Sequence, residues 1–380
     1  MEKLIQIGCV GDLILHEPGP MEPYFEDSKE DLKTIDVLIG QVETPHTNRA
    51  QPSCIDVQAP PSPPENLNVL RELGFDIATL AGNHAYDCGP FGVIDTIARL
   101  RELGIQPCGA GANIVEAKSP AIVEKEGIKV GVIDYNSVGP SLGWAMSTKA
   151  GCAYVDILTL YRSMDMPAYP PRVYTFVEPD SKKLMQADVA KLKAQCDIAV
   201  VVYHKGLGGR GPDLAMYEFE MTRAAIDAGA DIVFAHHAHM LKAIELYKDK
   251  PIFHGLGNFV TVTYALTPGM HHTTEKEKYL REREKQGRGL LEFDPPYYPW
   301  TEETLDTMIA AVTVSKAGIR EISFLPYRID KTAVPRKLSK TSGGQELLDN
   351  VISLTRSVGL ETGFSWSEDG LRVIVKKESL

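Results

Sequence analysis

The sequence predicts a layered α/β fold, and two features of the 380-residue chain support this prediction. Short apolar runs of strand length alternate with stretches whose apolar residues recur at three- and four-residue spacing, as they do in helices. Two hairpin signals in the second half of the chain favour antiparallel strands there. The composition, 43% hydrophobic and 24% charged, is ordinary for a globular protein that buries a large core.

Six apolar runs predict the strands, at residues 4–10, 37–39, 77–80, 130–134, 198–203 and 232–235. Helices are expected at residues 65–74, 92–104, 180–196 and 216–229. The first two helices end in Gly74 and Gly104, as helices commonly end. The stretches "IELYKDKPIFHGLGNFV" and "MIAAVTVSKAGIREISFLPYRI" predict hairpins that turn at Lys248–Asp249 and Lys316–Gly318.

We expect a single domain spanning residues 1–380, because neither a clear linker nor an internal repeat interrupts the chain. Residues 265–306 read as an irregular insertion that contains one charged helix. Residues 340–380 read as a C-terminal extension of helix and strand. Both segments are expected to be additions to one layered domain.

The opening residues, "MEKLIQIGCVGDLIL", read as a first strand rather than a signal peptide. No stretch approaches the roughly 18 apolar residues that a membrane helix requires, so we expect a cytoplasmic protein without a membrane span. Six scattered cysteines without a C-x-x-C pair indicate reduced thiols. The net charge of -11 disfavours nucleic acid as a partner, so an anionic substrate must meet a local positive site such as a metal ion.

Side chains of the types that bind metals follow five of the predicted strands. They are Asp12, Glu43, Asn83 with His84, His204, and His237 with His239. Because the carboxyl ends of strands in layered α/β folds open onto one crevice, these side chains are expected to converge. Each alone has a simpler interpretation as a helix cap, a turn residue or a surface carboxylate. Together, their carboxylate, amide and imidazole groups are the mixed set that two adjacent divalent ions require.

These residues lie in motifs that resemble the metallophosphatase-like superfamily, and within it the capsule-synthesis, poly-γ-glutamate accessory (CapA-type) family. The matching stretches are Gly11-Asp12, Val42-Glu43, "NHAYDCG" (83–89), "GAGAN" (109–113), His204, "HAH" (237–239) and "KPIFHGLGNFV" (250–260). The resemblance covers most of residues 3–260 and resumes at about 309–335. It implies an α-β-β-α metallophosphatase-like sandwich with mixed sheets.

The resemblance also implies roles for individual residues. The implied metal ligands, for one or two divalent ions such as Mn, Zn, Fe or Co, are Asp12, Glu43, Asn83, His204, His237 and His239. His84 is the expected acid or transition-state stabiliser, and Asp87 is expected to orient its ring. His236 occupies a variable place in the motif and stays outside the ligand set. The D-x-H pattern of ordinary metallophosphatases is absent, so one ion site is expected to be short of a ligand.

The stretch "HKGLGGRGP", residues 204–212, places Lys205 and Arg210 on a glycine-rich segment directly after a ligand histidine. Such a loop offers backbone N–H groups and two cations to an anion, so both residues are candidates for substrate binding. The alternative is a solvent-facing loop with ordinary surface charges.

The function expected from these features is that of a metal-dependent hydrolase. Metal-activated water would attack a phosphoester or a γ-glutamyl-type amide of a small or polymeric anionic substrate. One alternative is a metal-dependent epimerase, in which His84 or Lys205 moves an α-proton. Another is a non-catalytic accessory protein of poly-γ-glutamate or capsule synthesis. The identity of the metal, the substrate and the oligomeric state remain open at this level.

Overall fold

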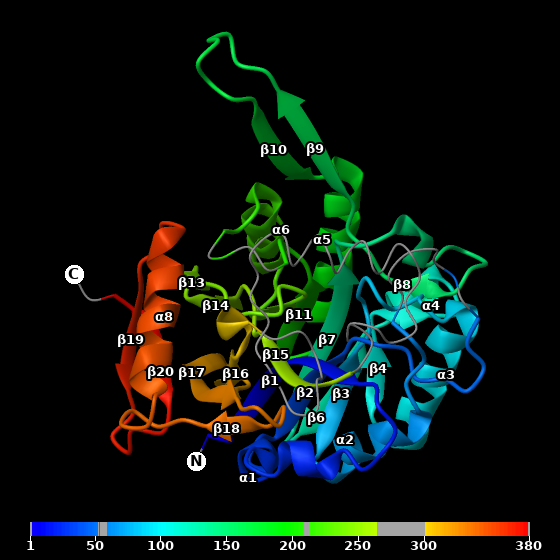
Figure 1. Ribbon diagram of the computed structural model, residues 1–380, viewed down its shortest axis with the longest axis vertical. Coiled ribbons are helices and arrows are strands. Elements are labelled where there is room, and N and C mark those ends of the chain that lie inside the picture. Colours follow the sequence, from blue (N-terminus) through cyan, green and yellow to red (C-terminus); the bar gives the residue numbers. More distant parts are fainter. Residues whose placement is uncertain are drawn as a thin grey trace.

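Two mixed β-sheets form the centre of the computed structural model, which describes residues 2–51, 53, 59–208, 211, 213–263 and 301–378 (Figure 1). The ten-stranded sheet runs in the order β19 (Thr362–Trp366), β20 (Val373–Lys377), β17 (Gly318–Ile329), β16 (Asp306–Ser315), β1 (Ile5–Leu15), β2 (Val37–Val42), β3 (Phe75–Thr79) and β4 (Gln106–Cys108), with β15 (Asn258–Val262) beside β1 and β18 (Pro335–Lys337) beside β17. The six-stranded sheet runs in the order β13 (Ile244–Tyr247), β14 (Lys250–Phe253), β12 (Ile232–His236), β11 (Ile198–His204), β7 (Ile128–Asn136) and β6 (Ala121–Lys125). Both sheets combine parallel and antiparallel pairs.

Helices cover the outer faces of both sheets. Those beside the ten-stranded sheet are α1 (Lys29–Lys33), α2 (Asn68–Glu72) and α3 (Gly89–Glu102), with the 3-10 turns η1 (Glu22–Phe25) and η2 (Pro64–Leu67). Those beside the six-stranded sheet are α5 (Pro179–Lys193) and α6 (Met216–Asp227). The remaining elements are α4 (Ile114–Ala117), η3 (Ser141–Gly143), η4 (Glu302–Thr304), α8 (Gly344–Ser357) and two small hairpin sheets, β5 (Ala110–Gly111) with β8 (Gly151–Cys152) and β9 (Ile157–Arg162) with β10 (Arg172–Val177).

The layer order follows from which side chains of each strand share a core. Ile7 of β1 packs in one buried cluster with Val200 of β11, so the inner faces of the two sheets meet. Leu38 of β2, whose neighbour Ile39 belongs to that inner cluster, packs with the helices of the first outer layer. Val201, the neighbour of Val200, packs with α5 and α6. Because alternate residues of a strand point to opposite faces, this arrangement confirms the predicted α-β-β-α sandwich with mixed sheets.

All six predicted strands are present, and both predicted hairpins turn where expected. Several boundaries differ, since β2 runs to Val42 and β7 from Ile128 to Asn136. The difference that matters for the site is that β1 continues to Leu15, so Asp12 lies within the strand rather than after it. The reason is that β1 changes neighbours, pairing with β16 over residues 5–9 and with β15 over residues 12–15. The second neighbour keeps the chain extended past the expected end. The β9–β10 hairpin was not predicted.

In the C-terminal region, β20 pairs with β17 and thereby joins the ten-stranded sheet. Of the insertion expected at residues 265–306, residues 265–300 lie outside the described part of the chain, and residues 301–306 carry η4 and the start of β16. The single-domain organisation and the cellular location stay predictions. Among the described helices, none has both the length and the apolar character needed to cross a membrane.

Candidate metal centre

The predicted ligand residues come together where strands of both sheets end. The ten-stranded sheet contributes Asp12 within β1, Glu43 directly after β2 and Asn83 in the loop after β3. The six-stranded sheet contributes His204 as the last residue of β11, and His237 and His239 directly after β12. The site therefore spans the two sheets, as the convergence of strand ends predicts.

Asp12, Glu43 and His239 form the tightest group. One ligand atom from each lies within 4.8 Å of the others, a spacing that suits a shared metal ion. His239 bridges the two carboxylates, because its Nδ1 lies 3.4 Å from Asp12 Oδ2 and its Nε2 lies 3.4 Å from Glu43 Oε1. Both acids are buried, whereas the His239 side chain keeps 17% of its surface exposed. Access from solvent is therefore on the histidine side.

A second group adjoins the first through Glu43. His204 Nε2 lies 3.9 Å from Glu43 Oε1 and 2.7 Å from Asn83 Oδ1. The His204 and His237 rings are 5.0 Å apart between centroids, and His237 donates its backbone N–H to Asp12 Oδ2 over 3.3 Å. The structure thus brings all six predicted ligands into one cluster in which Glu43 is central.

The "HAH" segment adopts a backbone that is unusual for its residue types. His237 has φ 90° and His239 has φ 54°, although neither is a glycine. Positive φ at such residues costs on the order of 1–3 kcal/mol and persists only where the surroundings impose it. The turn brings both rings and the His237 N–H to the carboxylate cluster. The strain is therefore associated with the arrangement of the site.

Several buried polar atoms of the cluster lack a hydrogen-bond partner among the described residues. They are Asp12 Oδ1, both Glu43 carboxylate oxygens, His204 Nδ1 and His237 Nδ1. Buried polar groups are nearly always paired, so such a concentration requires an explanation. A divalent cation would satisfy the carboxylate oxygens, and the chemistry of this donor set fits such an ion.

Protonation equilibria at the cluster fit the same interpretation. Burial and the neighbouring Glu43 carboxylate raise the pKa of Asp12 well above its ordinary value. Burial opposes ionisation of Glu43 as well, but the His239 and His204 imidazoles outweigh it and lower the pKa of Glu43. Burial and the neighbouring His239 lower the pKa of His237 to about 4. A neutral imidazole at ordinary pH is the form that binds a metal.

His84 and Asp87 form a pair beside this cluster. His84 Nδ1 lies 2.6 Å from Asp87 Oδ2, and the His84 side chain is 27% exposed against 5% for Asp87. Burial opposes protonation of His84, but the hydrogen bond and charge of Asp87 outweigh it and raise the pKa of His84. The contact has the geometry that the predicted orienting role of Asp87 requires. The catalytic roles themselves stay predictions.

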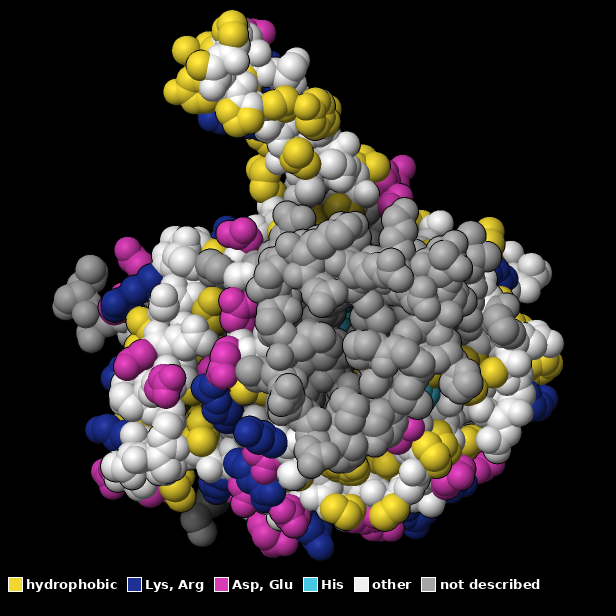
Figure 2. All heavy atoms as spheres, in the orientation of Figure 1, with side chains coloured by type: hydrophobic (Ala, Val, Ile, Leu, Met, Phe, Trp, Pro, Cys, Tyr) yellow, Lys and Arg dark blue, Asp and Glu magenta, His cyan; other side chains and the backbone are white. Residues whose placement is uncertain are grey.

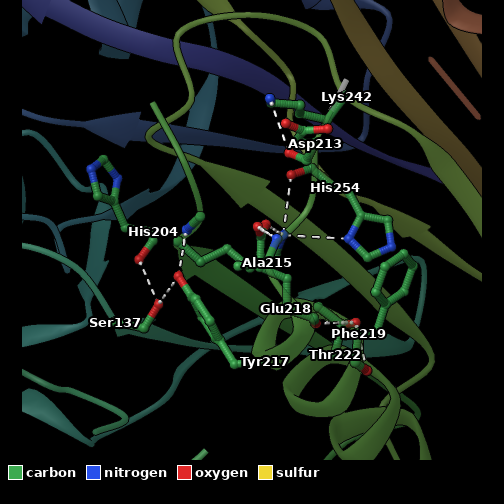
Figure 3. A network of polar contacts seen from close by, with 12 residues as sticks. Ser137, His204, Asp213, Ala215, Tyr217, Glu218, Phe219, Thr222, Lys242 and His254 are labelled. Atoms are coloured by element: carbon green, nitrogen blue, oxygen red, sulfur yellow. Dashed lines mark hydrogen bonds and ion pairs between the residues drawn. The ribbon is translucent and has the colours of Figure 1, made fainter. Parts of the chain in front are cut away.

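Lys205 lies in surroundings that differ from the expected substrate-binding loop. Its ammonium is buried, 2.6 Å from Glu218 Oε2 on α6 and 3.3 Å from His254 Nδ1 (Figure 3). His254 in turn lies 3.1 Å from Glu245. An ammonium that is buried and neutralised in this way is not available to an external anion, which corrects the expectation for Lys205. Arg210 lies outside the described residues.

Asn258, which is not among the site residues predicted from the sequence, touches the site directly. Its Oδ1 lies 3.0 Å from His239 Nδ1, and its Nδ2 donates to His239 O over 3.1 Å. Asn258 pairs with Asp12 in register across β15 and β1. A Cβ at Gly11 would lie 2.4 Å from Gly257 O, so this close pairing needs glycine. The "GLGNF" stretch was the signal that pointed to this position.

His236, which the sequence analysis left outside the ligand set, lies behind the cluster. Its Nε2 is 2.8 Å from Val10 O, and the residue is buried. This backbone contact occupies one ring nitrogen, which gives His236 a structural role between β12 and β1.

The chain matches a family model described as bacterial capsule synthesis protein PGA_cap over residues 6–263. It is 27% identical over 303 residues to the PGA biosynthesis protein CapA of Bacillus subtilis, covering 77% of this chain and 72% of that protein. It is also 30% identical over 203 residues to a probable polyglutamine synthesis accessory protein of Mycobacterium tuberculosis, covering 52% of this chain and 48% of that protein. The chain thus spans about half the length of the second relative.

Solved structures with some similarity include the calcineurin-like phosphoesterase YfkN from Bacillus subtilis, at 12% identity and a TM-score of 0.38, covering 94% of this chain and 100% of that chain. A putative 5'-nucleotidase from Staphylococcus aureus matches at 12% identity and a TM-score of 0.45, covering 92% of this chain and 58% of that chain. The family model spans more than half of the sequence, and the chain belongs to the family of bacterial capsule synthesis proteins described as PGA_cap.

Proposed function

We propose that the protein is a metal-dependent hydrolase whose centre lies at the Asp12, Glu43 and His239 cluster. The observation that carries this proposal is the set of buried carboxylate oxygens without hydrogen-bond partners among the described residues. Two buried acids side by side repel each other, and a divalent cation between them would offset both the repulsion and the loss of hydration.

Asp12, Glu43 and His239 would hold a first ion, and Asn83, His204 and His237 would complete the set for one or two ions. When bound, such an ion would supply a water of lowered pKa and a Lewis acid for the bond to be cleaved. His84 keeps its Nδ1 hydrogen-bonded to Asp87, which leaves Nε2 to donate a proton or a hydrogen bond. The raised pKa of His84 favours the protonated ring that this role needs.

The proposed substrate is an anionic phosphoester or γ-glutamyl-type amide. A chain of net charge -11 repels such a molecule at long range, so the metal centre supplies the local attraction. The γ-glutamyl class is suggested by the family description and by the relative named as a PGA biosynthesis protein. The phosphoester class rests on the known chemistry of paired divalent ions.

A second candidate is a non-catalytic accessory role in polymer synthesis. The Mycobacterium tuberculosis relative carries the name of an accessory protein, which favours this candidate. An accessory protein would need the fold and a metal but not a proton donor at the site. The epimerase alternative loses one of its two proton carriers, because Lys205 is buried against Glu218.

Metal-loaded protein assayed against phosphoesters and γ-glutamyl p-nitroanilide separates these candidates. We expect turnover of one class, with His84→Ala losing on the order of 100-fold or more in kcat while keeping its metal. His46→Asn is a matched control, because His46 is a buried histidine held by Pro63 O. Failure of the loaded protein to hydrolyse either class would overturn the hydrolase proposal. Exchange of a substrate α-proton in deuterated water without hydrolysis would instead favour an epimerase.

A further inference from the structure

The hairpin of residues 157–177, called the arm here, stands apart from both main sheets. Its strands β9 and β10 pair only with each other among the described strands. Figure 1 shows the arm projecting from the rest of the molecule. An isolated two-stranded hairpin is marginally stable in water, so a projecting arm of this kind gains from contact with a further surface.

One face of the arm is fixed to the body at its base. Tyr217 on α6 donates its backbone N–H to Thr175 Oγ1 over 3.2 Å, and Val177 donates its N–H to Glu220 over 3.0 Å. Because side chains alternate along a strand, Thr175 and Val177 share one face. The opposite face, called the free face here, is formed by the alternate residues Arg172, Tyr174 and Phe176 and their cross-strand partners Arg162, Leu160 and Leu158.

The centre of the free face is apolar and exposed. Two neighbouring cross-strand pairs make it up, Leu158 with Phe176 and Leu160 with Tyr174. The exposed fractions are 45% for Leu158, 48% for Leu160 and 38% for Phe176, which is high for side chains of this type. Figure 2 shows hydrophobic side chains on the projecting arm. The apolar pairs are therefore available to a partner.

Charges flank the apolar centre with opposite sign at its two ends. Toward the tip, Arg162 and Arg172 lie directly opposite each other and are exposed, and neither has an ion-pair partner within the described ranges. Like charges in a cross-strand pair destabilise a hairpin. At the base, Glu178 N continues the ladder to Asp156 O at 2.9 Å, and alternation assigns both acidic side chains to the free face. Each carboxylate also accepts a backbone N–H, Asp156 from Ile157 and Glu178 from Ser181.

We propose that the free face of the arm binds the same face of a second copy of this chain, with the two arms antiparallel about a two-fold axis. The axis would pass between the two apolar pairs, so that each apolar centre covers the other. The arginine pair and the acidic pair lie the same number of residues from the axis, on opposite sides of it. The arginine pair of each arm therefore lies over the acidic pair of its partner. A self-complementary pattern of this kind is what a two-fold interface requires.

The proposed interface between the two arms is small, so the dimer is expected to be weak. A two-stranded ribbon about 20 Å long covers roughly half of the ~800 Å² per partner that is typical of a stable interface. We therefore expect reversible association in the range of tens to hundreds of micromolar. Opposite charges at both ends define the direction of packing more than they add to affinity.

Sedimentation of the full-length protein over a concentration series tests the apolar centre. Wild-type protein should dimerise, and Leu160→Asp should weaken the dimer at least 10-fold. Tyr161→Asp is the matched control, because Tyr161 is 68% exposed but lies on the other face of the same strand. A wild-type monomer at several hundred micromolar, or a Leu160→Asp variant that associates like wild type, would overturn the proposal.

A charge exchange tests the antiparallel arrangement. One variant carries Arg162→Glu with Arg172→Glu, and the other carries Asp156→Lys with Glu178→Lys. Each alone should remain monomeric because tip and base then repel, whereas an equimolar mixture should form a heterodimer. Glu178 also accepts the Ser181 N–H at the start of α5, so circular dichroism is used to check that the Asp156→Lys, Glu178→Lys variant folds. If it does not fold, Asp156→Lys alone replaces it in the mixture.

Two further results would count against a second copy as the occupant. If the mixture of charge variants stays monomeric while wild type dimerises, the interface lies elsewhere. If wild type binds vesicles of phosphatidylcholine and phosphatidylglycerol without self-association, and Leu160→Asp abolishes that binding, the free face is a lipid contact.

Discussion

Histidine side chains in this protein occupy environments that favour opposite protonation states. His84 is held beside the Asp87 carboxylate, which raises its pKa despite burial. For His237, burial and the neighbouring His239 lower the pKa to about 4. The same residue type is therefore suited to proton donation at one position and to metal binding at another.

His46 tests how burial changes the pKa of a histidine that lies away from the candidate metal centre. Burial lowers the pKa of His46 to about 4 from an ordinary 6.5, and its Nδ1 donates to Pro63 O over 2.8 Å. The unfolded chain takes up this proton first on acidification, so the stabilisation is complete above pH 6.5 and is lost progressively down to about pH 4. Between these pH values, His46 should account for a change of roughly 3 kcal/mol in the free energy of unfolding, and His46→Asn should remove that change. Urea unfolding across this pH range measures it. An unchanged slope would contradict the account of this residue.

Asn258 should act on the metal through His239. Loss of the contact between Asn258 Oδ1 and His239 Nδ1 frees the ring to rotate, and partners of ligand histidines typically contribute 10- to 100-fold in metal affinity. Asn258→Ala should therefore bind Mn²⁺ about 10-fold or more weakly by calorimetric titration. Asn66→Ala is the control, since Asn66 is also buried but bonds to Leu15 O and Glu17 O. Equal affinities in both variants would sink this role.

The candidate ligands were predictable from sequence because each follows or ends a strand-length apolar run. Asn258 was harder to recognise, since its importance comes from the register of β15 against β1, 246 positions away from Asp12. Lys205 was misinterpreted for a related reason. Its counter-ion, Glu218, is supplied by the packing of α6, which no local pattern in "HKGLGGRGP" reveals.

At the scale of elements, the buried pair of Lys205 and Glu218 connects the end of β11 to the first turn of α6. Lys205 also donates to His254 O, in the segment after β14, over 3.3 Å. Figure 3 labels Glu218 and His254 within this network of polar contacts. The pair therefore joins three elements directly behind His204.

Glu218→Gln should lower the free energy of unfolding by about 3–5 kcal/mol, because it leaves a buried ammonium without its counter-charge. Combining it with Lys205→Met should restore part of this loss. Asp180→Asn, which removes an exposed pair with Lys183, should change stability by less than about 1 kcal/mol. Urea unfolding measures all three, and a Glu218→Gln variant as stable as wild type would contradict a charged pair.

Strands that are buried on both faces were predictable as continuous apolar runs, and β11, with all seven residues buried, is the clearest case. The arm was not predictable in this way. The strands "ILTLYR" and "RVYTFV" mix apolar, polar and charged residues because they have no core to cover. The early end predicted for β1 has a comparable cause, since its last residues are extended only by pairing with β15.

At the scale of the whole molecule, the candidate metal centre lies across the two sheets. Asp12 and Glu43 belong to the ten-stranded sheet, and His239 follows a strand of the six-stranded sheet. The layered order could be predicted from alternating strands and helices together with the family resemblance. Which strand faces which across the layers could not, because that depends on pairings between distant segments. The organisation as a single domain stays a prediction.

The most direct test of the account is titration of a divalent ion into chelator-stripped protein. Calorimetry with Mn²⁺ should show at least one ion bound per wild-type chain and a loss of about 100-fold or more in affinity for His239→Ala. Because the ligands come from both sheets, bound metal should also raise the unfolding temperature of wild type. Binding by His239→Ala as tight as that of wild type, or no binding by wild type, would contradict the central claim.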